Sequence, residues 1–210
     1  MTMEAVIHLS PLNEEVVLTV WIGTVTLLEI ARLFFHNYIP LSRPIEFHFY
    51  SGEEAGLKGS QAISEVYQRE RRPVVGMLQL DMTGYWDKTL GRKMGIVGDY
   101  TDPDLTAMLR LVVDEYTSNT TSRLETTCAY ACSGNPPHLP ACSRLTRSIL
   151  LDHSSWKRAG YRSAFAMETE FHSSNPNIHT SSDDVDNVDV TWMAEFVKVG
   201  IGLAGELASM

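Results

Sequence analysis

The stretch from Ile45 to Ser60 reads IEFHFYSGEEAGLKGS and decides how the rest of the chain is interpreted. Residues 45–50 are mostly β-branched or aromatic, which predicts a short strand. A glycine-containing turn ends that strand, the adjacent carboxylates Glu53 and Glu54 follow, and a helical pattern begins at the end of the stretch. Carboxylates at the carboxyl end of a strand lie where open α/β sheets bind their ligands. The stretch therefore predicts a ligand site at a sheet edge.

Neighbouring side chains leave the backbone in different directions, so Glu53 and Glu54 can take different roles. One can bind a metal ion while the other holds a proton for the water that attacks a substrate. The alternative is a solvated acidic loop, because most charged loop residues are simply exposed. The remainder of the chain decides between these two interpretations.

Strand-like and helix-like segments alternate along the rest of the chain. Residues 74–80 (VVGMLQL) form a nearly continuous apolar run, which is typical of a buried strand. The other expected strands are 93–97, 123–127 and 163–168, and the expected helices are 24–35, 61–72, 103–116 and 190–207. Residues 1–22 fit no regular element. This order predicts a single α/β domain, in which helices flank a mixed central sheet and an irregular segment precedes residue 23.

The composition is that of an ordinary soluble globular protein, with 210 residues of which 44% are hydrophobic and 20% charged. The net charge of -9 argues against nucleic acid and anionic membranes as partners. Glu29 and Arg32 interrupt the most apolar stretch, so no transmembrane helix is predicted. No signal peptide is recognised, because the first residues lack a basic region before an apolar core. An odd number of cysteines leaves one thiol unpaired in any disulfide scheme. They are Cys128, Cys132 and Cys142.

Two more polar residues follow predicted strands. Asp81 comes directly after the apolar run 74–80, and His179 lies in the polar segment 175–183. Carboxylates and an imidazole from separate strand ends can converge at one rim of the sheet. Oxygen and nitrogen ligands of this kind suit Zn²⁺. The spacing alone does not distinguish such a site from ordinary polar loops.

The sequences around these residues extend the pattern. The blocks, in chain order, are GTVTLLEIARL (23–33), IEFHFYSGEEAGLKGSQA (45–62), MLQLDMTGY (77–85), TTCAYACS (126–133), DHSSW (152–156) and NPNIHTSSD (175–183). Together they resemble the co-catalytic zinc aminopeptidases of the secreted bacterial and fungal leucine aminopeptidase type. The resemblance spans about residues 23–205. It implies a zinc-exopeptidase-like catalytic domain at 23–210.

The resemblance implies a role for each matched residue. Glu53 matches the general base, which takes a proton from the attacking water. Glu54, Asp81 and His179 match zinc ligands. The remaining matches are Met82 and Tyr130, which line the substrate pocket in the family, and Cys128 and Cys132, which form a disulfide beside it. Active members of the family hold two zinc ions and remove N-terminal leucine or other apolar residues from peptides.

The match fails where the family places two further metal ligands. The family's first zinc-binding His lies in a His-x-Asp-Ser segment, and its metal-bridging Asp precedes the helix that Gly23 opens. The corresponding position here reads LTVWI (18–22) and contains no carboxylate. His8 is followed by Leu-Ser, lacks the Asp of the family segment and lies too close to the helix. We therefore expect an unstructured terminus and one zinc ion or none in this chain.

A second departure splits a motif. The family runs from its second Cys directly into Asp-His-x-Ser-Trp, whereas residues 134–151 separate Ser133 from Asp152 here. The insertion spans a whole number of codons, and we hypothesise that it is a translated intron. Sequencing of the spliced transcript tests this hypothesis. If the mature mRNA encodes residues 134–151, the insertion is a genuine loop over the site. His153, within the DHSSW block, is expected to be a structural or pocket-rim residue rather than a ligand.

Three functions remain compatible with these features. The chain is a zinc metallo-exopeptidase in N-terminally truncated form, a catalytically inactive relative with a binding or structural role, or another two-metal hydrolase such as a carboxypeptidase or an amidohydrolase. The TTCAYACS and LDMTGY sequences favour the aminopeptidase over the third class. The two missing metal ligands both belong to one N-terminal segment. Such a pattern is typical of a truncated sequence rather than of an inactive relative that has lost site residues at random. The resemblance also implies an extracellular location, and we expect a monomer.

Overall fold

The computed structural model describes residues 2–9, 18–37, 42–53, 55–126, 151–170, 173–178 and 180–209. Its elements, in chain order, are β1 (Thr2–Leu9), α1 (Leu18–His36), β2 (Ile45–Ser51), α2 (Lys58–Glu70), β3 (Val74–Asp81), β4 (Lys93–Val97), α3 (Pro103–Tyr116), β5 (Ser122–Thr126), α4 (Asp152–Arg158), β6 (Ser163–Met167), the 3₁₀-helix η3 (Val185–Asn187) and α5 (Val190–Ser209).

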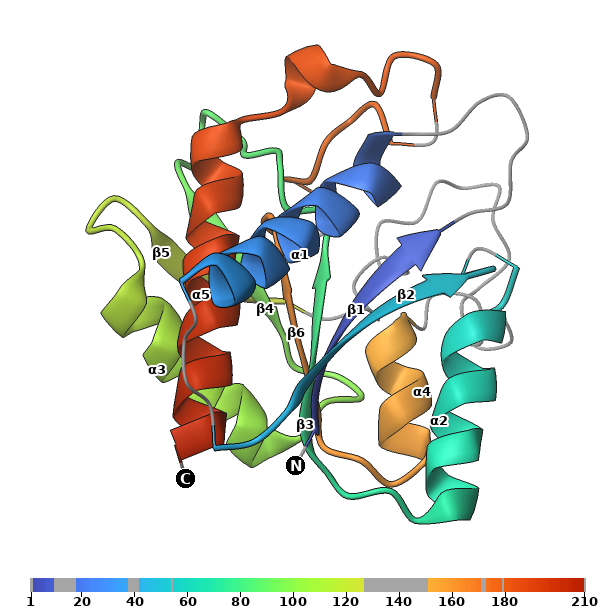
Figure 1. Ribbon diagram of the computed structural model, residues 1–210. Coiled ribbons are helices and arrows are strands. Elements are labelled where there is room, and N and C mark those ends of the chain that lie inside the picture. Colours follow the sequence, from blue (N-terminus) through green and yellow to red (C-terminus); the bar gives the residue numbers. More distant parts are fainter. Residues whose placement is uncertain are drawn as a thin grey trace.

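The strands within these described ranges form one six-stranded sheet in the order β2-β1-β3-β6-β4-β5. Every pair is parallel except β4 with β6, which is antiparallel. Figure 1 shows α1, α3 and α5 on one side of this sheet and α2 and α4 on the other. The predicted α/β fold with a mixed central sheet is therefore confirmed.

The two faces of the sheet bury different clusters. Leu78 and Leu80 of β3 pack into a large apolar core with side chains of α1, α3 and α5. Met77, which points to the opposite face, packs with Tyr67 of α2 and Trp156 of α4. This alternation is the period-two pattern of a strand that is buried on both faces. Fully burying one such side chain contributes about 1.5–3 kcal/mol, so β3 anchors both helical layers.

The N-terminal segment differs from the expectation of an irregular region. Residues 2–9 form β1, which pairs in parallel with β2 on one side and β3 on the other. Glu4 and His8 interrupt its apolar residues, so neither alternation nor a continuous apolar run predicts it. Helix α1 begins at Leu18 rather than near residue 24. The β-branched residues in its first turns lower helix propensity, but packing against the sheet overrides that preference.

Helix α4 was also missed, because its Asp152–Arg158 span is shorter than the window in which helical periodicity can be recognised. The remaining predicted strands and helices are present with small shifts at their ends. Within the described ranges, none of the helices combines the length and the apolar character that crossing a membrane requires.

Candidate metal and catalytic site

The predicted site residues follow parallel strands at one edge of the sheet. Glu53 lies two residues after the end of β2, and Asp81 is the last residue of β3. Strand β1 separates these strands and is parallel to both, so their carboxyl ends reach the same rim. The backbone of His8 lies near the end of β1, in register with Tyr50 of β2. The structure thus places Glu53, Asp81 and the backbone of His8 at neighbouring strand ends.

The turn that carries Glu53 is closed by backbone hydrogen bonds. The carbonyl oxygen of Glu53 accepts from the N–H groups of Gly56 and Leu57 at 2.8 and 2.9 Å. The carbonyl of Gly52 accepts from the N–H of Lys58 at 3.0 Å. Gly52 has a φ of 71°, a left-handed conformation that glycine adopts without strain. The tight turn connects β2 directly to α2 and fixes the direction in which the chain leaves the sheet.

The loop after Asp81 is fixed from several sides. Met82 adopts a left-handed conformation with a φ of 52°, which is uncommon for a residue with a side chain. Its carbonyl oxygen accepts from the N–H of Glu168 at 2.8 Å. The hydroxyl groups of Thr83 and of Thr26 on α1 form a buried hydrogen bond of 2.8 Å. These contacts hold the strained backbone beside Asp81 in one conformation.

Carboxyl groups gather around Asp81. Asp152 and Glu168 are each 1% exposed. Burial raises the pKa of Asp152 to about 7, opposed by a hydrogen bond from Ser60 and reinforced by the negative charge of Asp81. Burial likewise raises the pKa of Glu168 to about 8, opposed by backbone hydrogen bonds and again reinforced by Asp81. This edge therefore concentrates acidic groups whose ionised forms mutually repel.

Met82 also belongs to an apolar cluster at the same edge. It packs with Val97 of β4 and with Phe165 and Met167 of β6, all of which are buried. The partly buried Ile178, next to His179 in the sequence, packs against this cluster. A buried apolar cluster therefore lies beside the acidic groups.

The DHSSW block forms α4, and His153 lies fully inside the protein. Its backbone N–H donates to the side-chain oxygen of Gln79 at 2.7 Å, and its Nε2 lies 3.1 Å from the carbonyl oxygen of Asp99. The ring stacks on Phe165 with centroids 5.2 Å apart. Burial lowers the pKa of His153 to about 4. A hydrogen-bonded and fully buried imidazole is structural, which is one of the two roles expected for it.

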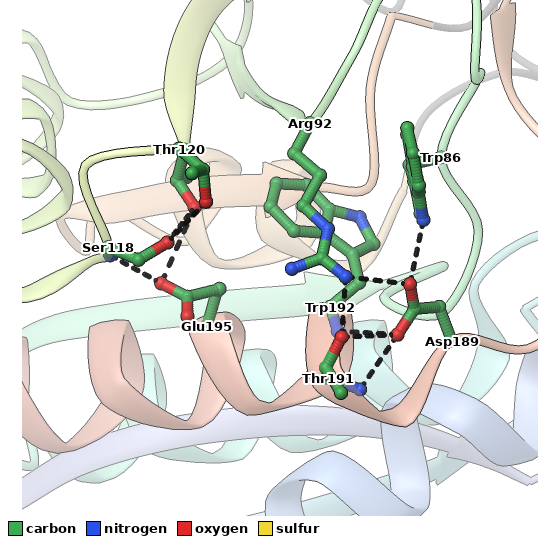
Figure 2. A network of polar contacts seen from close by, with 9 residues as sticks. Trp86, Arg92, Ser118, Thr120, Asp189, Thr191, Trp192 and Glu195 are labelled. Atoms are coloured by element: carbon green, nitrogen blue, oxygen red, sulfur yellow. Dashed lines mark hydrogen bonds and ion pairs between the residues drawn. The ribbon is translucent and has the colours of Figure 1, made fainter.

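A polar network joins the segment beyond the Asp81 loop to the start of α5 (Figure 2). The Oδ2 atom of Asp189 accepts from Trp86 Nε1 and from Arg92 Nη2, each at 2.8 Å. Its Oδ1 atom accepts from the N–H of Thr191 at 2.8 Å, which caps the helix. The backbone N–H of Asp189 donates to the carbonyl of Gly84 at 2.8 Å. The C-terminal helix is thereby tied to the loop that follows Asp81.

Several predicted residues lie outside the described part of the chain. They are Glu54, Tyr130, Cys128, Cys132 and His179, together with residues 134–150 of the insertion. Their predicted roles as metal ligands, pocket residues and disulfide partners stay predictions. Among the residues that are described, no group of three His, Cys, Asp or Glu side chains is arranged to hold a metal ion.

The donor chemistry at this edge nevertheless fits a cation. The Oδ1 atom of Asp152 is buried and has no hydrogen-bond partner among the described residues. Unpaired buried carboxylate oxygen is costly unless a charge or a proton compensates it. Asp81 interacts electrostatically with this group, and carboxylates are common zinc ligands. The fit rests on Asp81 and Asp152 and on the predicted ligands Glu54 and His179.

Sequence reasoning assigned no role to Asp152 or Glu168. Asp152 begins the DHSSW block, and Glu168 comes directly after the apolar residues of β6. The rule that singled out Asp81, a carboxylate immediately past a buried strand, applies equally to Glu168. That signal was present in the sequence, whereas the proximity of both groups to Asp81 depends on the fold.

The chain is similar to known peptidases. The model of peptidase family M28 matches residues 22–203. A leucine aminopeptidase 1 of Fusarium vanettenii is 38% identical over 193 residues, which cover 88% of this chain and 44% of the relative. A leucine aminopeptidase 1 of Sclerotinia sclerotiorum is 40% identical over 194 residues, which cover 89% of this chain and 45% of the relative. The chain therefore spans less than half the length of these fungal relatives.

Solved structures of aminopeptidases are also similar to this chain. The LapA aminopeptidase of Legionella pneumophila superposes with a TM-score of 0.81 and 31% identity, covering 100% of this chain and 52% of LapA. A zinc aminopeptidase of Bacillus subtilis superposes with a TM-score of 0.69 and 17% identity, covering 98% of this chain and 45% of that enzyme. The second likeness is one of fold alone.

Proposed function

Because the chain belongs to peptidase family M28, we propose that it is a metalloaminopeptidase that removes N-terminal leucine or other apolar residues from peptides. The observation that carries this proposal is the convergence of Glu53 and Asp81 at one sheet edge, beside the buried carboxyl groups of Asp152 and Glu168. The apolar cluster around Met82 supports an apolar substrate residue.

Glu54, Asp81 and His179 would hold zinc, which supplies a positive charge that polarises the substrate carbonyl. Glu53 acts as the general base: it takes a proton from the water that attacks the peptide bond and delivers it to the departing amine. Met82 and Tyr130 line the pocket for the N-terminal side chain. The residues that pack against Met82 are buried and apolar.

An inactive protein with a binding or structural role is the second candidate. Residues 18–22, where the resemblance places a metal-bridging Asp, contain no carboxylate and form the first turns of α1. Without that ligand we propose that the chain holds one zinc ion or none. The fold and the remaining site would then serve binding rather than turnover.

Location and assembly complete the proposal. We propose that the protein acts outside the cell as a monomer and that Cys128 and Cys132 form a disulfide, which is consistent with an oxidising compartment. Mass spectrometry of the unreduced protein checks the disulfide, because a linked pair resists alkylation. Two alkylated thiols at these positions would remove that support for secretion.

The first experiment measures zinc per chain in the purified protein and hydrolysis of a leucyl chromogenic substrate. Turnover that stops with a chelator and returns with zinc supports the aminopeptidase. About two zinc ions with turnover would contradict the proposed low occupancy but keep the enzyme. No more than one ion without turnover would support the inactive candidate and reject catalysis by this chain.

A further inference from the structure

Glu168 is a buried acidic residue outside the predicted site. It comes directly after β6, whose last residue, Met167, pairs with Asp81 at the end of β3. Its side chain is 1% exposed. A buried carboxyl group is costly unless hydrogen-bond donors satisfy it, so its partners indicate what the residue is for.

The two oxygens of Glu168 bind two different loops. Oε2 accepts from the backbone N–H of Tyr85 at 2.8 Å, and Oε1 accepts from the backbone N–H of Asn175 at 3.1 Å. The backbone N–H of Glu168 itself donates to the carbonyl of Met82 at 2.8 Å. One residue therefore connects the loop after Asp81 to the segment that begins at Asn175.

Each of these loops leads to a predicted zinc ligand. Tyr85 lies four residues after Asp81, and Asn175 lies four residues before His179. The second loop is stiffened internally, because the side chain of Asn175 donates to Asp183 Oδ1 at 2.7 Å and accepts from a backbone N–H. The side chain of Asn175 therefore ties residue 175 to residues 177 and 183, which lie on either side of residue 179 in the sequence.

We infer that Glu168 is a positioning residue, whose carboxyl group sets the loop of Asp81 and the loop of His179 in one fixed relation. This inference rests on the proposed function insofar as it concerns zinc. Residues outside the ligand shell that orient ligands commonly change metal affinity by 10–100-fold when they are replaced. Glu168 acts through backbone atoms and does not itself need to contact metal or substrate.

A control variant distinguishes a positioning role of Glu168 from a purely structural one. Glu195 on α5 is also buried, at 5% exposure, and its Oε2 accepts from the backbone N–H of Ser118 at 2.7 Å (Figure 2). Both Glu168→Gln and Glu195→Gln replace a buried carboxyl group that accepts from the backbone by an amide, and the second change also removes the ion pair with Lys198. Only the first change lies between the two predicted ligand loops.

The experiment combines hydrogen exchange with zinc titration against a chromophoric chelator. In Glu168→Gln, the amides of both Tyr85 and Asn175 should exchange at least about tenfold faster, and zinc affinity should fall by roughly 10–100-fold. In Glu195→Gln, both amides and the zinc affinity should stay unchanged, while exchange at Ser118 rises.

A measurement on the unaltered protein covers the case in which the variant fails to fold. If Glu168 joins the loops, the amides of Tyr85 and Asn175 should open with the same free energy and the same response to denaturant. Separate openings, or faster exchange of one amide alone in the variant, would overturn the inference. An unaltered protein that takes up no zinc and shows no turnover would overturn the proposed function, while the exchange data still decide the role of Glu168.

Discussion

A β-carbon on Gly59 would lie 2.8 Å from the carbonyl oxygen of Ser51 and 2.9 Å from its backbone nitrogen. Side-chain carbons essentially never approach backbone atoms this closely. The first turn of α2 therefore packs directly against the end of β2 because residue 59 has no side chain. This contact closes the base of the turn that carries Glu53, so the position of the proposed general base depends on a glycine six residues later.

Replacing Gly59 by alanine should therefore destabilise the protein although alanine favours helices. We expect a loss of about 1–3 kcal/mol in the free energy of unfolding, since backbone atoms must move to relieve the overlap. The matched control is Gly205→Ala on α5, where nothing lies within 4 Å of the added carbon. That change should stabilise by up to about 1 kcal/mol through helix propensity. Equal effects in denaturant unfolding would contradict the steric argument.

The buried imidazole of His153 should make stability depend on pH. Its pKa in the folded protein is about 4, below the ordinary value of 6.5, so between these pH values the unfolded chain binds a proton that the folded chain does not. Stability should therefore fall on acidification, by about 2 kcal/mol between pH 7 and pH 5. The raised pKa values of Asp152 and Glu168 act in the opposite direction, so the contribution must be isolated by comparison.

That comparison uses His153→Gln, which removes the titrating ring and retains a hydrogen-bonding side chain. Urea unfolding of both proteins at pH 7 and pH 5 gives the difference directly. The variant should lose about 2 kcal/mol less than the unaltered protein over this range. Identical losses would mean that the pKa of His153 is the same in the folded and unfolded states.

Asp189 should contribute strongly to stability. Burial opposes its ionisation, but hydrogen bonds from Thr191, Trp86 and Arg92 outweigh that effect and hold the pKa of Asp189 well below its usual range. Its stabilisation is thus complete above the ordinary pKa of 3.8 and is lost as the pH falls below it. Asp189→Asn should cost about 2–3 kcal/mol near neutral pH, because hydrogen bonds to a charged acceptor are replaced by weaker ones.

The control for Asp189 is Asp184→Asn. Asp184 caps η3 by accepting from the N–H of Asp186, but its surroundings are exposed. Its replacement should change thermal stability by no more than about 0.5 kcal/mol. If the two variants melted alike, the network in Figure 2 would not be the source of the stability.

Glu53→Gln tests the proposed base. A glutamine cannot accept the proton, so kcat for the leucyl substrate should fall by about 10²–10⁴-fold while KM and zinc content stay unchanged. Glu65→Gln, an exposed position on the adjacent helix α2, serves as the control and should keep full activity. Undiminished turnover in Glu53→Gln would assign the proton transfer to another group.

The sequence predicted the elements whose residues carry a strong local pattern. Strand β3 was recognised because its apolar run is continuous, and α3 because Asp102 and Pro103 mark its start. Strand β1 was not, since Glu4 and His8 break its pattern and its stability comes from partners that follow much later in the chain. The strand propensity of residues 2–9 carries no information about pairing with strands that are distant in the sequence.

The same limit applies to the site. Glu53 and Asp81 were predicted as site residues because each follows a recognisable strand, and the structure places both at one rim of the sheet. The role of Glu168 could not be found, because it depends on Tyr85 and Asn175 meeting one carboxyl group from different parts of the chain. A role that depends on the type of a residue and its place after a strand can be predicted from the sequence. A role that depends on contacts between distant parts of the chain requires the structure.

The position of β6 in the sheet has a consequence for the order of events during synthesis. Among the strands that the structure describes, β6 is the last to be synthesised, yet it lies between β3 and β4. Until residues 163–167 emerge, β2-β1-β3 and β4-β5 are separate halves with unpaired edges that invite wrong contacts. The nascent chain therefore cannot complete the carboxyl rim of its sheet gradually. Insertion of β6 joins the halves and delivers Glu168 to Asp81 in the same step.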